Sequence, residues 1–282
     1  MIDLSKSSID LSETDFQRIA KIAKQGWGLN LDSAKKPLIK SRLGKRLTKL
    51  KLAKFDTYCK IVEAGDEEER QHFVSALTTN VTHFYREKHH FDHLETYILP
   101  NLIEKARNGM RVRIWSAGCS SGQEPYSLAG LLLKIDNKVS EFNLKILATD
   151  IDPIVLKKAK LGRYSTNECS FPTTELENRL FAKNVHAEEQ REIREELRTL
   201  ITFRHLNLIQ PWPISGSFDV IMCRNVAIYF DKPTQNKLWR RFSDALVPEG
   251  RLYIGHSERI SDPQQADLIS SGVTTYNRIC AK

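Results

Sequence analysis

Long apolar segments and paired cysteines are both missing from this sequence. No apolar run reaches the roughly 20 residues that a membrane-spanning helix needs, and the N-terminus lacks the basic and then apolar profile of a signal peptide. The five cysteines are isolated, without a CxxC pair or a histidine at zinc-ligand spacing. These absences predict a folded cytoplasmic protein without disulfides or a metal.

Acidic residues are also missing from one segment of a chain that is basic as a whole. The net charge of +8 favours an acidic partner, which is a nucleic acid, an anionic membrane surface or an acidic protein. Residues 33–54 contain nine cations and no acid: Lys35, Lys36, Lys40, Arg42, Lys45, Arg46, Lys49, Lys51 and Lys54. Ile39, Leu43, Leu47 and Leu50 recur there at helical spacing, so we expect an amphipathic helix with a basic outer face.

The hydrophobic pattern divides the chain into two domains. Residues 15–24 and 68–78 are also helical in pattern, so residues 1–85 predict a small all-α domain, followed by a linker over 86–106. Residues 107–282 alternate short apolar runs with helical stretches, which predicts an α/β, Rossmann-like domain. Its expected strands are 112–115, 144–149, 200–206, 218–223, 251–254 and 273–279, and its expected helices are 125–133, 153–160 and 233–246. The long polar interval at about 163–200 predicts an inserted subdomain.

A turn of small residues follows the first expected strand and leads into a helix. It runs from Ser116 to Tyr126 and contains Gly118 and Gly122, which allow the backbone to approach a ligand closely. The turn is neither a phosphate-binding P-loop nor a GxGxxG motif. A nucleotide-type site and an ordinary turn are equally compatible with this loop alone.

Polar residues also follow the second and third expected strands. Asp150 is positioned to accept hydrogen bonds from a ribose diol, as acids do at this point of Rossmann-like sheets. Asp152 precedes Pro153 and is interpreted as the N-cap of a helix. Asn207, which precedes Leu208 after the third strand, is either a turn former or a neighbour of an adenine ring.

Arg224, Asn225 and Tyr229 interrupt an apolar run after the fourth expected strand, at the edge where open α/β sheets bind ligands. The alternatives are a surface charge for Arg224 and a core aromatic for Tyr229. Between the two domains, Asn80 and Thr82 are either helix caps or site residues. Arg86 is either a surface ion-pair partner or a planar fork for a free carboxylate.

Four segments together closely resemble the chemotaxis receptor methyltransferase family, often called CheR. They are residues 79–86 (TNVTHFYR), 117–127 (AGCSSGQEPYS), 148–152 (ATDID) and 223–231 (CRNVAIYFD), in the family's order. Any one match is compatible with chance, but four in order are highly specific. Gln123 stands where the family usually has glutamate and Ala227 where it often has methionine. Neither departure removes a group that we assign to chemistry.

The resemblance implies a small N-terminal helical domain, a Rossmann-like methyltransferase domain and an inserted β-subdomain. It implies that S-adenosyl-L-methionine donates a methyl group to receptor glutamate carboxylates, leaving glutamate methyl esters and S-adenosyl-L-homocysteine. The residues that would bind the cofactor are Asn80, Thr82 and Arg86 at its methionine end, Gly118 and Glu124 from the first loop, Asp150 at the ribose, Asn207 and Leu208 at the adenine, and Arg224 with Asn225 closing the site.

The expected reaction requires positioning more than acid–base chemistry. A glutamate carboxylate with a pKa near ~4.3 is already ionised at neutral pH and needs no general base. The site must align the carboxylate with the methyl group and partly desolvate it. We assign this catalytic role to Arg86 and Tyr229.

The basic helix has a natural partner in an acidic helical segment of the receptor. We expect Lys40, Arg42, Lys45, Arg46 and Lys49 to bind it, with a merely solvated face as the alternative. The expected protein is a monomer that binds no nucleic acid and inserts into no membrane. A nucleic-acid methyltransferase is disfavoured because the Asn/Asp-Pro-Pro-aromatic turn and a Pro-Cys nucleophile are missing from the sequence. A non-catalytic receptor-binding module is disfavoured because Asn80, Arg86, Glu124, Asp150 and Asn225 are all present.

Overall fold

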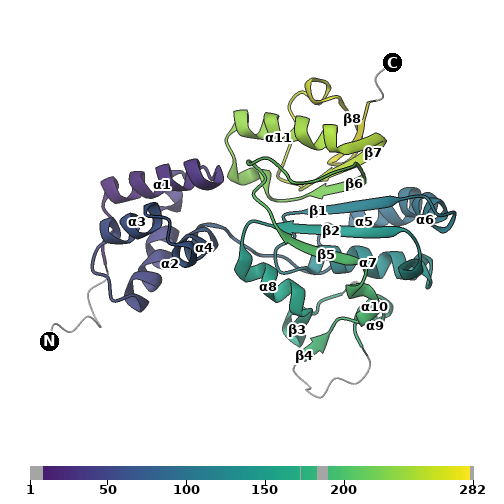
Figure 1. The fold of residues 1–282 in the computed structure, drawn as a ribbon, viewed down its shortest axis with the longest axis horizontal. Coiled ribbons are helices and arrows are strands. Elements are labelled where there is room, and N and C mark those ends of the chain that lie inside the picture. Colours follow the sequence, from purple (N-terminus) through teal and green to yellow (C-terminus); the bar gives the residue numbers. More distant parts are fainter. Residues whose placement is uncertain (1–8, 172, 183–189, 280–282) are drawn as a thin grey trace. The chain divides into compact units, whose positions relative to one another are not determined.

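The computed structural model describes residues 9–171, 173–182 and 190–279, and these form two compact units (Figure 1). The helical unit extends to Thr79 and also contains Tyr229–Asp231, whereas the α/β unit contains the rest. The boundary at Thr79 comes earlier than the expected domain end at residue 85. No helix in the described ranges is long and apolar enough to cross a membrane.

The helical unit consists of four α-helices and one short 3₁₀-helix in its described part. They are α1 (Glu13–Trp27), η1 (Ser33–Lys35), α2 (Lys36–Lys49), α3 (Phe55–Glu63) and α4 (Glu67–Leu77). Helix α1 begins where the Ser12 hydroxyl accepts a hydrogen bond from Asp15 N at 3.0 Å, and it ends at Gly28, whose φ is 72°. Helix α2 buries Ile39, Leu43 and Leu47, which confirms the expected apolar stripe.

The α/β unit is built on a seven-stranded sheet with the order β5-β2-β1-β6-β7-β9-β8. Its strands are β1 (Val112–Ala117), β2 (Leu144–Asp150), β5 (Ile201–His205), β6 (Phe218–Cys223), β7 (Leu246–Ile254), β8 (Leu268–Gly272) and β9 (Thr275–Arg278). The first five strands in this order are parallel, and β9 runs antiparallel to both of its neighbours. The carboxyl ends of the parallel strands therefore meet at one edge, where such sheets bind ligands.

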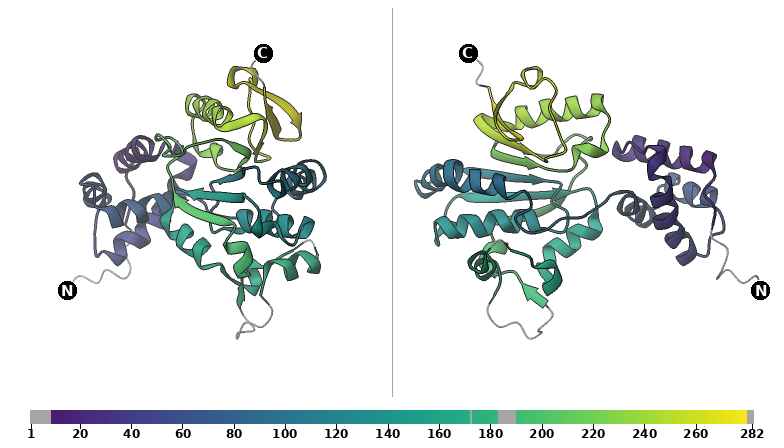
Figure 2. Two further views of the ribbon diagram at one scale, coloured as in Figure 1. Left: turned by 45° about the vertical axis from the view of Figure 1, so that its right-hand side comes forward. Right: turned by 180° about the vertical axis from the view of Figure 1, so that it is seen from behind.

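Helices pack against this sheet and complete the core (Figure 2). The helical elements of this part of the unit are α5 (Lys88–His93), the π-helix η2 (Leu94–Ile98), α6 (Leu99–Arg107), α7 (Gln123–Ile135), η3 (Val139–Glu141), α8 (Pro153–Leu161), α11 (Lys232–Ala245) and η6 (Gln264–Ala266), of which α6, α7, α8, α11 and η6 contact strands of the sheet. The short η5 (Ala227–Tyr229) ends at Tyr229, which belongs to the helical unit. Residues 86–106, expected as a linker, are mostly helical and place Phe91, Leu94 and Leu99 in the hydrophobic core. This stretch is therefore part of the α/β unit and not a linker, because its apolar residues pack into the core of that unit.

A small β-subdomain interrupts the α/β unit between α8 and β5. Its elements are β3 (Arg163–Ser165), η4 (Thr166–Glu168), α9 (Thr174–Leu180), β4 (Gln190–Glu192) and α10 (Glu195–Arg198). Strands β3 and β4 pair antiparallel and form a separate two-stranded sheet. This confirms the inserted β-subdomain that the family resemblance implies.

Candidate functional site

The loop after β1 lies between the ends of two neighbouring strands. The backbone N–H groups of Gly118 and Cys119 donate to the Thr149 carbonyl oxygen of β2, at 2.7 and 2.9 Å. On the other side, a Cβ atom added to Gly118 would lie 2.2 Å from Cγ2 of Val226, which follows β6. Gly118 also has a φ of +91°. Glycine is therefore required here both by the left-handed backbone and by the close approach of the two loops.

Asp150 ends β2 with a buried carboxylate beside this loop. Its Oδ2 accepts a hydrogen bond from Ser120 N at 2.7 Å, and its Oδ1 accepts one from Asp152 N at 2.9 Å. Asp150 is only 8% exposed. Burial raises the pKa of Asp150 to about 6, although the two N–H donors favour the ionised form. The two hydrogen bonds thus fix the orientation of the Asp150 carboxyl group, and its pKa lies close to neutral pH.

The segment after the helical unit lies beside the same loop. Asn80 Nδ2 donates to Asp152 Oδ2 at 2.7 Å, and the Asn80 carbonyl accepts from the Ser120 hydroxyl at 3.0 Å. Asp152 also caps α8 by accepting from Ile154 N at 2.8 Å, which confirms its interpretation as an N-cap. Thr82 and Arg86 follow in a turn-rich stretch, where Arg86 Nη1 donates to the Val81 carbonyl at 2.8 Å.

A buried ion cluster joins the start of α7 to the end of β6. Arg224 Nη1 lies 3.0 Å from Glu124 Oε2, and Arg224 Nη2 lies 3.2 Å from Glu87 Oε2. Ser116 Oγ donates to the other oxygen of Glu124 at 2.7 Å. The Arg224 side chain is only 2% exposed. The alternative of a surface charge is therefore wrong for Arg224, which is buried and pairs with two largely buried acids.

The pKa values of the two acids in this cluster are shifted in opposite directions. Burial raises the pKa of Glu124, against the charge of Arg224 and the hydrogen bonds from Ser116 and Arg224. Burial also acts to raise the pKa of Glu87, but hydrogen bonds from His256 and Asn225 and the charge of Arg224 lower it to about 2. Glu87 is consequently ionised at neutral pH.

Asn225 lies at the centre of this edge in a left-handed conformation, with a φ of 60°. Its Nδ2 donates to Glu87 Oε1 at 2.9 Å, and its backbone N–H donates to Glu258 Oε2 at 2.9 Å. His256 Nδ1 lies 2.8 Å from the same Glu87 oxygen. We did not predict Glu87, His256 or Glu258 from the sequence. The position of His256 and Glu258 just after an expected strand was the only signal for them.

The turn after β5 contains Asn207 and the buried Leu208. Asn207 Oδ1 accepts from Ile209 N at 3.1 Å, and its carbonyl accepts from Gln210 N at 3.2 Å. The turn-forming role of Asn207 is therefore confirmed. A contact of Asn207 and Leu208 with adenine stays a prediction.

Tyr229 belongs to the helical unit and is partly buried there. Its hydroxyl donates to the Thr79 carbonyl at 3.1 Å and accepts from Thr79 N at 3.3 Å. Its own carbonyl accepts from Asn30 N at 2.7 Å, and Lys35 Nζ lies 5.6 Å from the centre of its ring. The protein thus fixes both the ring and the hydroxyl of Tyr229.

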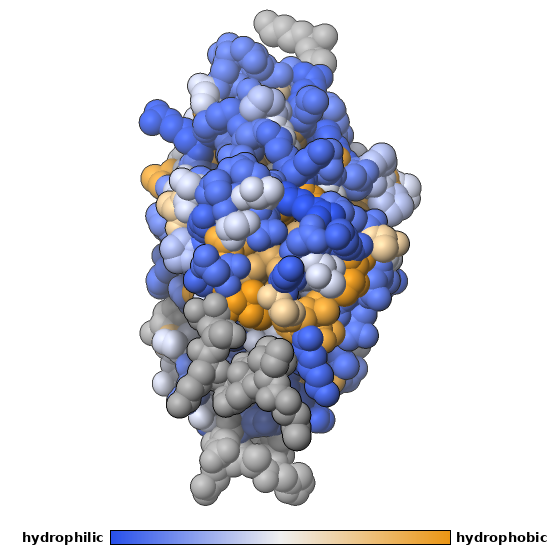
Figure 3. All heavy atoms as spheres, turned by 90° about the vertical axis from the view of Figure 1, so that its left-hand side faces the viewer, coloured by the Kyte–Doolittle hydropathy of each residue, from blue (hydrophilic) through white to orange (hydrophobic). Residues whose placement is uncertain are grey.

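The cations of α2 divide into two groups. Arg46 is only 9% exposed and pairs with Glu69, and Arg42 Nη1 donates to the carbonyls at the end of α4, at 3.1 Å for Ala76 and 2.6 Å for Thr78. These two arginines stabilise the unit internally. Lys40 also has a partner in the unit, Asp10, at 2.7 Å, and together with Lys45 it lines an open groove of about 480 Å³ along α2. Figure 3 shows a largely hydrophilic face of the molecule, with a smaller apolar patch.

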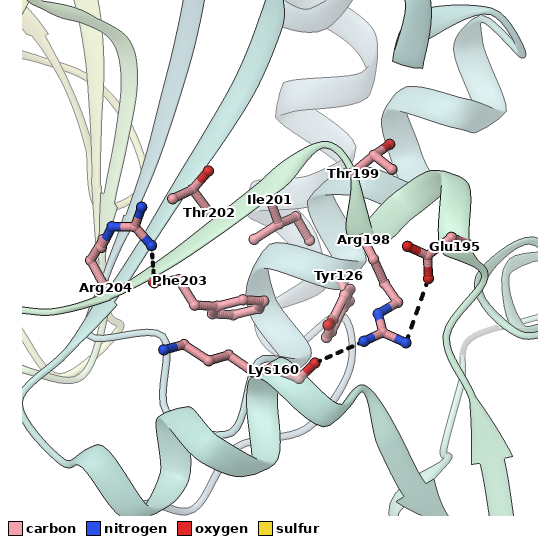
Figure 4. Close-up of a pocket in the computed structure, with 9 residues that line it drawn as sticks. All are labelled: Tyr126, Lys160, Glu195, Arg198, Thr199, Ile201, Thr202, Phe203 and Arg204. Atoms are coloured by element: carbon pink, nitrogen blue, oxygen red, sulfur yellow. Dashed lines mark hydrogen bonds and ion pairs between the residues drawn. The ribbon is translucent and has the colours of Figure 1, made fainter.

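A second groove, of about 420 Å³, lies beside β5 in the α/β unit (Figure 4). Its lining side chains come from α7, α8, α10 and β5 and include the aromatic rings of Tyr126 and Phe203. Arg198 donates to the Lys160 carbonyl at 3.2 Å, and none of our predicted site residues lines this groove. The groove is therefore separate from the residues gathered at the carboxyl edge.

Potential metal ligands come together once among the described residues. Glu87, His89 and His90 each offer an atom within 4.8 Å of the others. Arg224 lies 3.2 Å from Glu87, and burial lowers the pKa of His90 to about 3. A guanidinium group so close to the carboxylate disfavours a further cation there.

The parallel sheet, the small-residue loop after β1 and the buried acid ending β2 define the class of α/β proteins that bind a nucleotide-type cofactor. Residues 80–276 match the family described as "CheR methyltransferase, SAM binding domain", and residues 14–78 match "CheR methyltransferase, all-alpha domain". The chain belongs to the CheR methyltransferase family. The family resemblance, the fold class and the enzyme class expected from the sequence are thereby confirmed.

Relatives in several bacteria match this chain over nearly its whole length. A probable chemotaxis protein methyltransferase of Rhizobium etli is 44% identical over 88% of this chain and 94% of the relative. The chemotaxis protein methyltransferase of Escherichia coli is 38% identical, with coverages of 94% and 91%, and that of Salmonella typhimurium is 39% identical, with coverages of 89% and 86%. Both units of the structure are therefore shared with these relatives.

Proposed function

We propose that this S-adenosylmethionine-dependent methyltransferase esterifies glutamate side chains on the cytoplasmic helical region of chemotaxis receptors. The match of both units to the two domains of one methyltransferase family carries this proposal. The methyl donor is S-adenosylmethionine, whose sulfonium makes the methyl group electrophilic. The acceptor is the glutamate carboxylate, and the products are a methyl ester and S-adenosylhomocysteine.

The polar groups at the carboxyl edge fit this cofactor in their chemistry. Each Asp150 oxygen accepts one described backbone hydrogen bond, and an ionised carboxylate oxygen can accept a second one from a ribose hydroxyl. The planar guanidinium of Arg86 suits the free carboxylate of the methionine moiety. We assign Asn80 and Thr82 to the same end, Gly118, Glu124, Arg224 and Asn225 to the walls of the site, and Asn207 with Leu208 to the adenine.

The proposed chemistry needs no proton transfer from the protein. A glutamate carboxylate is ionised at neutral pH, so the residues have to orient it in line with the methyl group and exclude water. We assign this task to Arg86 and to Tyr229. The Tyr229 hydroxyl donates its single hydrogen to the Thr79 carbonyl, so this bond has to be exchanged for one to the substrate carboxylate when the substrate binds.

The experiment that tests the proposed function uses methyl-tritiated S-adenosylmethionine with receptor-bearing membranes and, separately, with total RNA. We expect label in the receptor band that alkali releases as volatile methanol, because esters hydrolyse in base. Receptors whose methylation-site glutamates are replaced by alanine are the matched control and should remain unlabelled. Label in RNA, or alkali-stable label in protein, would contradict the proposal.

The exposed lysines of α2 are proposed to bind the acidic receptor helix. Lys45 lines the groove along α2, and Lys49 lies one helical turn further on. The double variant K45E/K49E should reduce the initial rate of receptor methylation roughly tenfold at low salt, because charge reversal removes the electrostatic attraction that speeds association. The defect should shrink at higher ionic strength.

The control for this surface is K21E, which reverses a single charge at an exposed position of α1 in the same unit. S-adenosylhomocysteine affinity, measured by calorimetry, should be unchanged in both proteins. Arg42 and Arg46 are unsuitable for this test because their replacement also removes internal bonds of the unit. Normal methylation by K45E/K49E would rule out this surface.

A further inference from the structure

One carboxylate holds the backbone of two loops at the carboxyl edge of the sheet. Glu258 Oε1 accepts hydrogen bonds from Val226 N at 2.9 Å and from Ala227 N at 2.6 Å. Its Oε2 accepts from Asn225 N at 2.9 Å and from Gly255 N at 2.5 Å. Glu258 is only 7% exposed. A single buried side chain thus satisfies four backbone N–H groups.

These N–H groups lie where β6 and β7 have stopped pairing. Asn225 has a φ of 60°, so its backbone has turned out of the strand conformation. The loops still approach closely, because a Cβ atom added to Gly255 would lie 2.6 Å from Asn225 N. Buried N–H groups without acceptors are costly. Glu258 replaces the lost strand pairing and thereby fixes the conformation of the turn.

We propose that Glu258 is a positioning residue for the cofactor site. It holds the backbone of Asn225–Ala227, while Glu87 holds the Asn225 side chain through Nδ2 at 2.9 Å. Asn225 is thereby constrained from two directions. This inference rests on the proposed function, in which Asn225 contacts S-adenosylmethionine.

The arrangement requires a carboxylate in particular. Four N–H donors need two oxygen atoms that only accept. A glutamine in the same place would turn its amide NH₂ toward two of these donors. An aspartate would retain the charge but would be one methylene group too short to reach both loops.

The test is calorimetric binding of S-adenosylhomocysteine and of S-adenosylmethionine to the full-length variant E258Q. We expect the dissociation constant to rise about tenfold to a hundredfold, because two N–H groups lose their acceptor. The factor should be the same for both ligands. S-adenosylmethionine carries a sulfonium charge and S-adenosylhomocysteine does not, so a loss confined to S-adenosylmethionine would show a direct charge effect and overturn the positioning role. In steady-state assays, KM for the cofactor should rise more than kcat falls.

Two further variants make the outcome decisive. D219N is the matched control, because Asp219 Oδ2 accepts from Arg113 N at 2.8 Å near the other end of β6; its cofactor affinity should be normal. N225A separates the inference from the site assignment. Weak binding by N225A with normal binding by E258Q would overturn the role of Glu258 alone. Normal binding by N225A would remove Asn225 from the site, and the role of Glu258 with it.

The fold of each variant is checked by circular dichroism and thermal unfolding. E258D provides a second test, because aspartate keeps the negative charge but its side chain is too short to contact both loops. This variant should also bind both ligands more weakly, by the same factor for each. An unfolded E258Q would assign Glu258 to the fold as a whole and overturn the proposal.

Discussion

Replacing Arg224 with methionine should lower the free energy of unfolding of the α/β unit by about 3–5 kcal/mol, the usual effect of breaking a buried ion pair. The guanidinium lies 3.0 Å from Glu124 and 3.2 Å from Glu87, and its side chain is 2% exposed. Without it, two buried carboxylates face each other without a cation. The loss should be measured by urea unfolding at pH 7, followed through the tryptophan fluorescence of the α/β unit.

The pH dependence of this loss has a definite sign. In the native protein the pKa of Glu87 is about 2, below its ordinary value of 4.5. Glu87 therefore contributes stability that is present above pH 4.5 and is lost as the pH falls through about 2. R224M reduces this contribution, so the difference in stability between the two proteins should be largest above pH 4.5 and should narrow below it.

The control for R224M is R204M, the same substitution at an exposed position of β5, which should change stability by less than about 0.5 kcal/mol. The triple variant E87Q/E124Q/R224M removes all three charges and should recover part of the loss. A loss below about 1 kcal/mol in R224M would mean that the ion cluster contributes little to the fold.

Replacing Asp150 with asparagine should weaken S-adenosylhomocysteine binding by at least about a hundredfold at pH 8, because two hydrogen bonds to a charged acceptor are worth about 1.5–3 kcal/mol each. Asparagine offers one acceptor oxygen instead of two. It therefore also leaves either Ser120 N or Asp152 N without its present partner. Calorimetric titration measures the loss directly.

The native protein should show a pH dependence that D150N lacks. The pKa of Asp150 is raised to about 6, so the carboxylate is ionised above this pH and protonated below it. Since the ribose hydroxyls bind best to the ionised form, native affinity should fall as the pH drops below 6, by up to about tenfold per pH unit. D136N, which alters an acid at the end of α7, should retain this pH dependence. The same pH profile in native protein and D150N would exclude Asp150 as the titrating group.

Helix and strand patterns were largely readable from the sequence because they are local. Expected strand 218–223 coincides with β6, and expected helix 153–160 nearly coincides with α8. Strand β8 gave no such signal, since most of its residues are exposed and it lacks an alternating apolar pattern. Helix α3 was likewise not predicted, because its nine residues span few helical turns.

The stretch 86–106 shows why the hydrophobic pattern along the chain did not reveal that this segment belongs to the α/β unit. It lay between the helical pattern of residues 1–85 and the alternating pattern of residues 107–282, whereas in the structure Phe91, Leu94 and Leu99 pack into the core of the α/β unit. Proline is compatible with the first turn of a helix, and Pro100 lies there in α6. Whether such a segment packs depends on the surface that it meets, and that surface comes from strands later in the chain.

The sequence by itself determined what this protein lacks and which four motifs it contains. Missing apolar runs, isolated cysteines and an acid-free basic helix need no structure to be recognised. The motifs predict Asp150, Arg224 and Asn225 as candidate site residues, because parallel strands bring their carboxyl ends to one edge. Sequence order and chemical type were sufficient for these inferences.

Only the tertiary structure decided which of these groups touch each other. Arg224 and Glu124 are 100 positions apart, and Glu258 reaches the Asn225 backbone across 33 positions. Arg46 belongs to the basic helix in the sequence, yet it is buried against Glu69 of α4. Charge and spacing along one segment do not specify such partners, because burial and hydrogen bonding depend on residues that folding brings from elsewhere in the chain.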